Sequence, residues 1–149
     1  MDAAHSGKRW QAGDDPLSYG IIGAAIEVHR LLGPGLLESA YEECLCLELS
    51  LRAIPFERQV TLPIVYKSIT LQRAYKPDLL IDKAVIVELK TVDKILPVHE
   101  AQLLTYLKLS GLDRALLLNF NSVPLKSGIR RLNKSLPVLP VSQAVPAAD

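Results

Sequence analysis

The chain has 149 residues, of which 49% are hydrophobic and 22% charged, a composition that suits one globular domain around one core. Lys and Arg number 17 against 16 Asp and Glu, so the formal net charge of +1 excludes a global basic field for nucleic acid. No apolar run approaches the ~20 residues of a membrane span, and free thiols without a secretory signal predict a cytoplasmic location.

The two ends of the chain lack the patterns of folded segments. Residues 1–15 are polar and without periodicity, which predicts a flexible N-terminal arm. Residues 136–149 are rich in Pro, Ala and Val, a composition that predicts a disordered tail. Residues 16–135 are therefore expected to form a single domain without an internal repeat or linker.

Two helices are predicted at the start of this domain. The apolar residues from 17 to 32 recur at helical spacing on nearly all sides, which predicts a buried helix ended by Gly33-Pro34-Gly35. A second helix is predicted from 36 to 52. Its apolar face is expected to consist of Leu37, Tyr41, Cys44, Leu47 and Leu51.

Strand patterns begin after Ile54-Pro55. Residues 56–66 alternate in part and 69–75 follow after a short turn, so the two segments are predicted to form a hairpin. Two further strands are predicted at 78–81 and 85–89, and a tight turn at Asp82-Lys83 joins them.

The remainder of the domain predicts one more helix and one more buried strand. The helix runs from 98 to 110 and ends at Gly111, and the apolar run 115–120 is the strand. Residues 128–132 fit either a short last strand or a helical turn. The order α-α-β-β-β-β-α-β predicts an α/β or α+β domain with a mixed central sheet flanked by helices.

Charged side chains interrupt the apolar strand 85–89. Side chains alternate along a strand, so Glu88 and Lys90 are expected on the same face as Ile86. An unpaired charge in such a place costs several kcal/mol, which requires a compensating partner.

Asp78 on the neighbouring strand supplies a second carboxylate. Asp78 and Glu88 can converge on one hard cation, Mg²⁺ or Mn²⁺, to which the backbone carbonyl of Leu89 can add an oxygen. Lys90 can then hold a water for attack on phosphorus or stabilise the developing charge. The spacing equally fits a buried Glu-Lys or Asp-Lys ion pair, or a strand end that reaches solvent.

The pattern Pro77-Asp78, a spacer, then Glu88-x-Lys90 resembles the PD-(D/E)XK nuclease superfamily. Residues 35–41 read GxxExxY, the pattern that names a family of small bacterial proteins placed in that superfamily. The resemblance to the GxxExxY family covers residues 17 to 132 and extends to the stretches 27–30, 54–57, 97–102 and 118–121. It implies a PD-(D/E)XK nuclease-like core that cleaves nucleic acid, DNA rather than RNA, with Mg²⁺ or Mn²⁺. Since many nucleases of this superfamily act as dimers, a homodimer is one assembly that it allows.

The resemblance also implies supporting residues around Asp78, Glu88 and Lys90. Gln102 and Tyr106 match the QxxxY motif of the exonuclease branch and share one helix face. Alternatively, Tyr106 packs on the sheet while Gln102 faces water. Glu27 resembles the acid that the superfamily carries on its first core helix as a metal ligand, although pairing with Arg30 explains it equally. Glu38 is a second-tier candidate, because the helix dipole alone favours an acid there.

Three hypotheses follow. The first is a metal-dependent nuclease in which Asp78 and Glu88, with Glu27 as a third carboxylate, bind the metal and Lys90 activates water. The second is a non-catalytic module on the same fold that binds nucleic acid or protein. The third is a buried structural pair, for which apolar replacement of Glu88 and Lys90 is neutral or stabilising.

Overall fold

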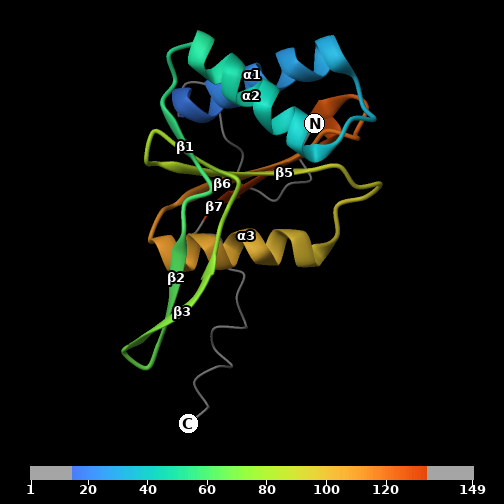
Figure 1. The fold of residues 1–149 in the computed structure, drawn as a ribbon. Helices are drawn as coiled ribbons and strands as arrows, with labels where there is room; N and C mark the ends of the chain where they lie inside the picture. Colours follow the sequence, from blue (N-terminus) through green and yellow to red (C-terminus); the bar gives the residue numbers. More distant parts are fainter. Residues whose placement is uncertain (1–14, 134–149) are drawn as a thin grey trace.

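A mixed five-stranded sheet lies between two helices on one face and a third helix on the other (Figure 1). The structure is a computed structural model that describes residues 15–133, apart from the side chains of 72–74. Residues 1–14 of the predicted arm and the predicted tail 136–149 lie outside the described residues. Asp15, which was assigned to the arm, instead caps the first helix, and its carboxylate also pairs with Arg114.

The first two helices pack against each other and cover one face of the sheet. Helix α1 runs over Pro16–Leu32 and helix α2 over Glu38–Leu51. Helix α1 is not buried all round, because Ile26 is 41% and Leu31 64% exposed. Its buried face consists of Ser18, Ile21, Ile22, Ala24, Ala25 and Val28.

The predicted apolar face of α2 is wrong by part of a turn. Leu47 and Leu51 are exposed, and the buried residues are Tyr41, Glu42, Leu45, Cys46 and Leu49. Leucines occupy both sides of this helix, so periodicity alone did not identify the side that meets the sheet. Tyr41 lies on the side that meets the sheet, and its ring stacks on that of Phe120 at a centroid distance of 4.5 Å.

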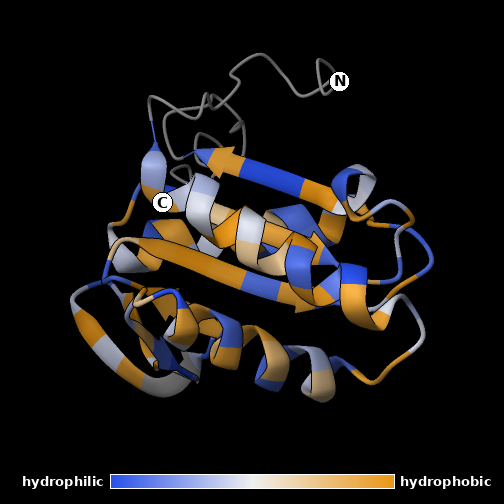
Figure 2. Ribbon diagram, turned by 90° about the horizontal axis from the view of Figure 1, so that it is seen from above, coloured by the Kyte–Doolittle hydropathy of each residue, from blue (hydrophilic) through white to orange (hydrophobic). Residues whose placement is uncertain are grey.

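The central sheet has the order β1-β4-β5-β6-β7. Its strands are β1 (Phe56–Arg58), β4 (Leu79–Ile81), β5 (Val85–Lys90), β6 (Arg114–Asn119) and β7 (Ile129–Asn133). Strands β5 and β6 are parallel and the other pairs are antiparallel. Helix α3 (Pro97–Ser110) makes the crossover that a parallel pair requires, and it covers the second face. The sheet's strands are hydrophobic over much of their length in Figure 2.

The predicted strand 56–66 divides into two strands that belong to different sheets. Strand β1 joins the central sheet, whereas β2 (Leu62–Tyr66) pairs with β3 (Ile69–Tyr75) in a separate hairpin that runs beside α3 (Figure 1). The break falls at Gln59, which has a φ of 53° and donates its backbone N–H to the carbonyl of Asp78 over 3.0 Å. At the other end, the strand alternative for residues 128–132 holds, because Ile129–Asn133 form β7, and a 3-10 turn at Leu125–Gly128 precedes it.

Candidate active site

Asp78 and Glu88 lie opposite each other where β4 begins. Leu79 pairs with Val87 in the antiparallel register, so the next position brings Asp78 across from Glu88. Each carboxylate accepts a hydrogen bond from the opposite segment's backbone. The N–H of Asp78 donates to Glu88 Oε1 over 3.0 Å, and the N–H of Leu89 donates to Asp78 Oδ2 over 2.8 Å. These reciprocal bonds fix both acids on the α3 side of the sheet.

Both carboxyl groups have pKa values above their ordinary ones, because burial disfavours their ionised forms and too little positive charge lies nearby to stabilise them. Burial raises the pKa of Glu88 to about 7, and the charge of Asp78 adds to the rise. Burial also raises the pKa of Asp78, which the Leu89 N–H and a Gln59 hydrogen bond oppose. Glu88 is only 8% exposed, so water does little to relieve this repulsion. The pair is therefore a site at which a cation would be stabilised.

Lys90 ends β5 on the same face as Glu88. Its charge lowers the pKa of Glu88, Asp78 and Glu38, which indicates that its ammonium group faces this acidic cluster. Within residues 15–133, however, Lys90 forms no salt bridge with a carboxylate. A closed ion pair between Lys90 and Glu88 or Asp78 is therefore not among the salt bridges of these residues. Lys90 is half-buried and its charge is not committed to one partner.

Asn119 holds the segment that follows Lys90. It is 1% exposed and lies opposite Lys90 in the parallel β5–β6 register. Its side-chain oxygen accepts from the N–H of Val92 over 3.0 Å, and its amide donates to the carbonyl of Val92 over 2.9 Å. A further bond to Ser122 satisfies the amide. Residues 118–121 contribute only to the family resemblance in the sequence, and this role of Asn119 could not be predicted because it depends on a contact across 27 residues.

Replacing Asn119 with Ala is expected to lower the free energy of unfolding by about 2 kcal/mol, since several buried hydrogen bonds lose their partner. Urea denaturation measures the change. Asn121→Ala is the matched control, because its buried side-chain oxygen has no hydrogen-bond partner among the described residues. Equal losses of stability in the two variants would contradict the role given to Asn119.

The start of α2 brings further carboxylates to the site. Burial raises the pKa of Glu38, and the charge of Asp78 raises it further. The loop before Glu38 is held by Tyr41, whose hydroxyl donates to the carbonyl of Gly33 and accepts from the N–H of Leu36. The tyrosine of the GxxExxY pattern thus fixes the position from which its glutamate approaches the acidic pair.

Glu42 is a site residue that the sequence reading missed. It lies one turn after Glu38, is 9% exposed, and its charge raises the pKa of Asp78. Its carboxylate accepts a hydrogen bond of 3.1 Å from Arg58, which neutralises it. The i, i+4 spacing of the two glutamates was the available signal.

Glu27 is not brought to this cluster. Its carboxylate accepts two hydrogen bonds from Arg30, at 3.1 and 3.0 Å, and Arg30 holds its pKa below the usual range. The other charge that affects its pKa is that of Arg52, not that of Asp78 or Glu88. Of the two acids predicted on the first helices, Glu38 is the one that approaches Asp78 and Glu88.

Tyr106 lies beside the acidic pair and Gln102 lies at its margin. Tyr106 is 3% exposed, and burial together with the charges of Glu88 and Asp78 raises its pKa. Its ring packs on that of Tyr75 at a centroid distance of 5.6 Å. Gln102, one turn earlier on α3, is half-buried and lines a surface groove with Tyr75. Both residues of the predicted motif therefore flank the site.

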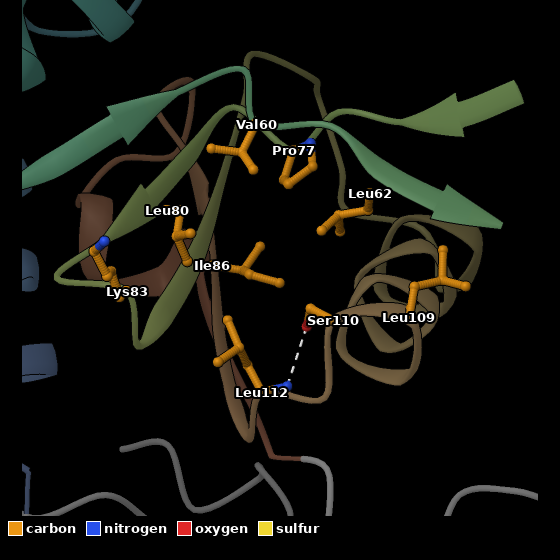
Figure 3. Close-up of a pocket in the computed structure, with 9 residues that line it drawn as sticks. All are labelled: Val60, Leu62, Pro77, Leu80, Lys83, Ile86, Leu109, Ser110 and Leu112. Carbon is orange, nitrogen blue, oxygen red and sulfur yellow. Dashed lines mark hydrogen bonds between the residues drawn. The ribbon is translucent and has the colours of Figure 1, made fainter. Parts of the chain in front are cut away.

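A second hollow on this side of the sheet carries different chemistry. It has a volume of about 320 Å³ and adjoins Asp78 through Pro77 (Figure 3). Its walls are aliphatic apart from Lys83 and Ser110, and the Ser110 hydroxyl accepts a hydrogen bond from the N–H of Leu112. No carboxylate lines this hollow, so it is not a candidate for the reaction centre.

The donor set fits a hard divalent cation only in part. Nowhere within residues 15–133 do three Asp, Glu, His or Cys side chains cluster in a way that could hold a metal ion. Mg²⁺ does not require such a cage, because it commonly takes one or two carboxylates and keeps several waters. Asp78 and Glu88 supply those two carboxylates, and burial raises the pKa of both, so a nearby cation would favour their ionised forms.

Among the described residues, no helix has the length and apolar content needed to cross a membrane.

Comparison with known proteins gives one match. No curated protein and no solved structure matches the chain. A family model described as the PD-(D/E)XK nuclease superfamily matches residues 15–132, which include Asp78, Glu88 and Lys90. The match spans most of the chain and agrees with the mixed sheet flanked by helices, and so the chain belongs to the PD-(D/E)XK nuclease superfamily.

Proposed function

We propose that this protein is a metal-dependent nuclease that hydrolyses phosphodiester bonds. The observation that carries the proposal is the buried, mutually repelling pair Asp78 and Glu88, with the uncommitted charge of Lys90 on the same strand face. A structural ion pair would place the lysine against one carboxylate, whereas this arrangement retains a net negative charge for a cation. Clusters of carboxylates with raised pKa values are typical of functional sites.

Nucleases of this superfamily generally use divalent metal ions. Asp78, Glu88 and the carbonyl of Leu89 would hold the ion, with Glu38 as a nearby acid in place of Glu27. When bound there, Mg²⁺ or Mn²⁺ would supply Lewis-acid stabilisation of the phosphoryl oxygens and a water of lowered pKa.

The chain's own residues would do the rest. Lys90 would hold the attacking water or stabilise negative charge on the phosphoryl oxygens, because its charge acts on both acids while no described carboxylate forms a salt bridge with it. Tyr106 is buried near Glu88, and its raised pKa keeps it neutral, so it would not act as a base near neutral pH. Asn119 holds the end of β5 in place from across the sheet.

The substrate class is proposed as nucleic acid, DNA rather than RNA, on the strength of the GxxExxY resemblance. The same resemblance supports a bacterial protein and allows a homodimer, and the free thiols without a secretory signal support a cytoplasmic location. Incubation with single- and double-stranded DNA and RNA in Mg²⁺ or Mn²⁺ tests the proposal. Cleavage that depends on the metal and disappears in Glu88→Ala and Lys90→Ala supports it. Metal-independent cleavage, or none above those controls, favours the alternative of a non-catalytic binding module.

Glu38→Gln is expected to weaken Mn²⁺ binding and lower cleavage by about tenfold, the usual effect of removing an acid that acts beside the ligands. Glu27→Gln is the matched control on the first helix and is expected to change neither quantity, since its carboxylate pairs with Arg30. Calorimetric Mn²⁺ titration and cleavage rates measure both variants. A larger loss in Glu27→Gln would restore the original assignment of Glu27 as the third carboxylate.

A further inference from the structure

A groove between β3 and α3 opens beside the candidate active site. Its volume is about 360 Å³, within the range of sites for small ligands. Its walls are formed by Tyr75, Val98, His99, Ala101, Gln102 and Thr105. We refer to this surface as the Tyr75 groove. The β2–β3 hairpin that contributes Tyr75 crosses α3 in Figure 1, and its two strands form a sheet separate from the central one.

The groove is continuous with the acidic pair through two aromatic rings. Tyr75 packs against Tyr106 at an interplanar angle of 63°, and Tyr106 lies near enough to Glu88 and Asp78 for their charges to act on it. Tyr75 also precedes Asp78 by only three residues in the chain. Tyr75 therefore lies near the acidic pair, and the contact with Tyr106 positions its ring while 37% of the residue stays exposed.

The groove offers an aromatic ring together with neutral polar groups. Gln102 carries both a donor and an acceptor. The Nδ1 of His99 accepts the N–H of Leu96 over 2.9 Å, so the other ring nitrogen is the donor of the neutral imidazole. The Thr105 hydroxyl donates to the carbonyl of Ala101 over 3.1 Å and keeps its lone pairs for a further donor. This set matches a nucleobase, which has a stacking face and an edge of donors and acceptors.

Charge in the groove is compatible with a polyanion. None of the described residues that line it is acidic, and Glu100 on the same helix forms a salt bridge of 3.2 Å with Arg130. Lys76, directly after Tyr75, is exposed. Groups that lie between a strand and a helix can reach a base only when it is free of its partner, since the bases of a duplex are stacked and paired inside it.

We propose that the Tyr75 groove binds an unpaired base of a single strand whose backbone crosses Asp78 and Glu88, with Tyr75 as the stacking residue. The inference rests on the proposed function for the identity of the ligand and adds single-strandedness to it. Tyr75 lies outside the Asp78–Lys90 and Gln102–Tyr106 motifs, so neither motif predicts this role.

Fluorescence anisotropy with labelled oligonucleotides of about a dozen nucleotides tests the groove, with EDTA present so that binding is measured without cleavage. Wild type is expected to bind a single strand, DNA or RNA in separate arms, more tightly than the duplex of the same sequence. Tyr75→Ala is expected to weaken single-strand binding roughly tenfold and Tyr75→Phe to retain it, because the ring supplies the stacking. Tyr66→Ala, at an exposed tyrosine on the same hairpin, is the matched control and should not change affinity.

A second variant keeps the proposal testable if Tyr75→Ala misfolds. Ala101→Leu fills the groove from an exposed helix position without altering the Tyr75–Tyr106 contact, and it should weaken single-strand binding with unchanged thermal stability. Equal affinity for the duplex, or no loss in both Tyr75→Ala and Ala101→Leu, would overturn the proposal. Because binding is read in EDTA, an absence of cleavage would count against the nuclease assignment alone.

Discussion

Cleavage by Lys90→Met is expected to fall by about a thousandfold, the scale of losing one charge that stabilises a transition state. Lys90 is the cation whose charge reaches both Asp78 and Glu88, yet no salt bridge to a described carboxylate holds it in place. The methionine chain keeps most of the apolar length of the lysine stem. Initial rates on an end-labelled oligonucleotide in excess Mn²⁺ measure the effect.

Measuring metal binding distinguishes the loss of the Lys90 charge from a loss of the metal site. Lys90→Met should still bind Mn²⁺ in calorimetry, and with equal or higher affinity, because the positive charge that competes with the metal is gone. Lys94→Met is the matched control, an exposed lysine four residues further along, and should cleave as the wild type does. Retention of full cleavage by Lys90→Met would remove Lys90 from the mechanism.

Glu88→Gln is expected to make the metal-free protein more stable than wild type by up to about 3 kcal/mol at pH ~8, at 1.36 kcal/mol for each unit of pKa shift. The carboxyl of Glu88 has a pKa of about 7 in the folded chain against a model value of 4.5. The ionised form is therefore destabilised by folding. Glutamine keeps the oxygen that accepts the Asp78 N–H and turns an amide towards the Asp78 carboxylate.

The sign of the effect fixes its pH dependence. A raised pKa means that the folded protein binds the extra proton, so this stability is present below the unfolded pKa and is lost as the pH rises through about 7. The two proteins should thus have similar stability near pH ~4, diverge as the pH rises from 4.5 to about 7, and keep a constant gap above that. Thermal melts in EDTA measure this, with a gap of roughly 10 °C at the alkaline end.

Glu43→Gln provides the control for this stability effect. Glu43 is an exposed glutamate on α2, and its substitution should give no gap at either end of the pH range. If Glu88→Gln is less stable than wild type at alkaline pH, the carboxylate has a stabilising partner and the account of a mutually repelling acidic pair fails.

Local patterns in the sequence were sufficient to predict the elements that carry the acidic pair. The apolar run 85–89 is strand β5, and the turn at Asp82-Lys83 takes a φ of 53° at both residues. The register between β4 and β5 follows from that turn, so the meeting of Asp78 and Glu88 was within reach of the sequence. Boundaries of α1 and α3 agree with the prediction to within one residue.

Features that depend on distant contacts were not predictable. The break at Gln59 follows from a bond to Asp78, and the buried side of α2 follows from the fit of its side chains against the sheet. Glu27 and Glu38 are both acids on amphipathic helices, and only the packing of those helices decides which one reaches the site. Tyr75 reads as an ordinary strand residue until α3 is folded beside it.

The reciprocal bonds between the two acids and the opposing backbone have a consequence for how this family can vary in length. The strand register determines the geometry of the site, since the N–H of Asp78 can donate to Glu88 only while Leu79 pairs with Val87. An insertion of one residue at the turn that shifts the pairing would turn one acid towards α1 and α2, and the sheet itself would survive. The length of the turn between β4 and β5 is thus constrained by the need to keep the two acids together rather than by the stability of the sheet. A change of length at the turn of the β2–β3 hairpin does not alter this register.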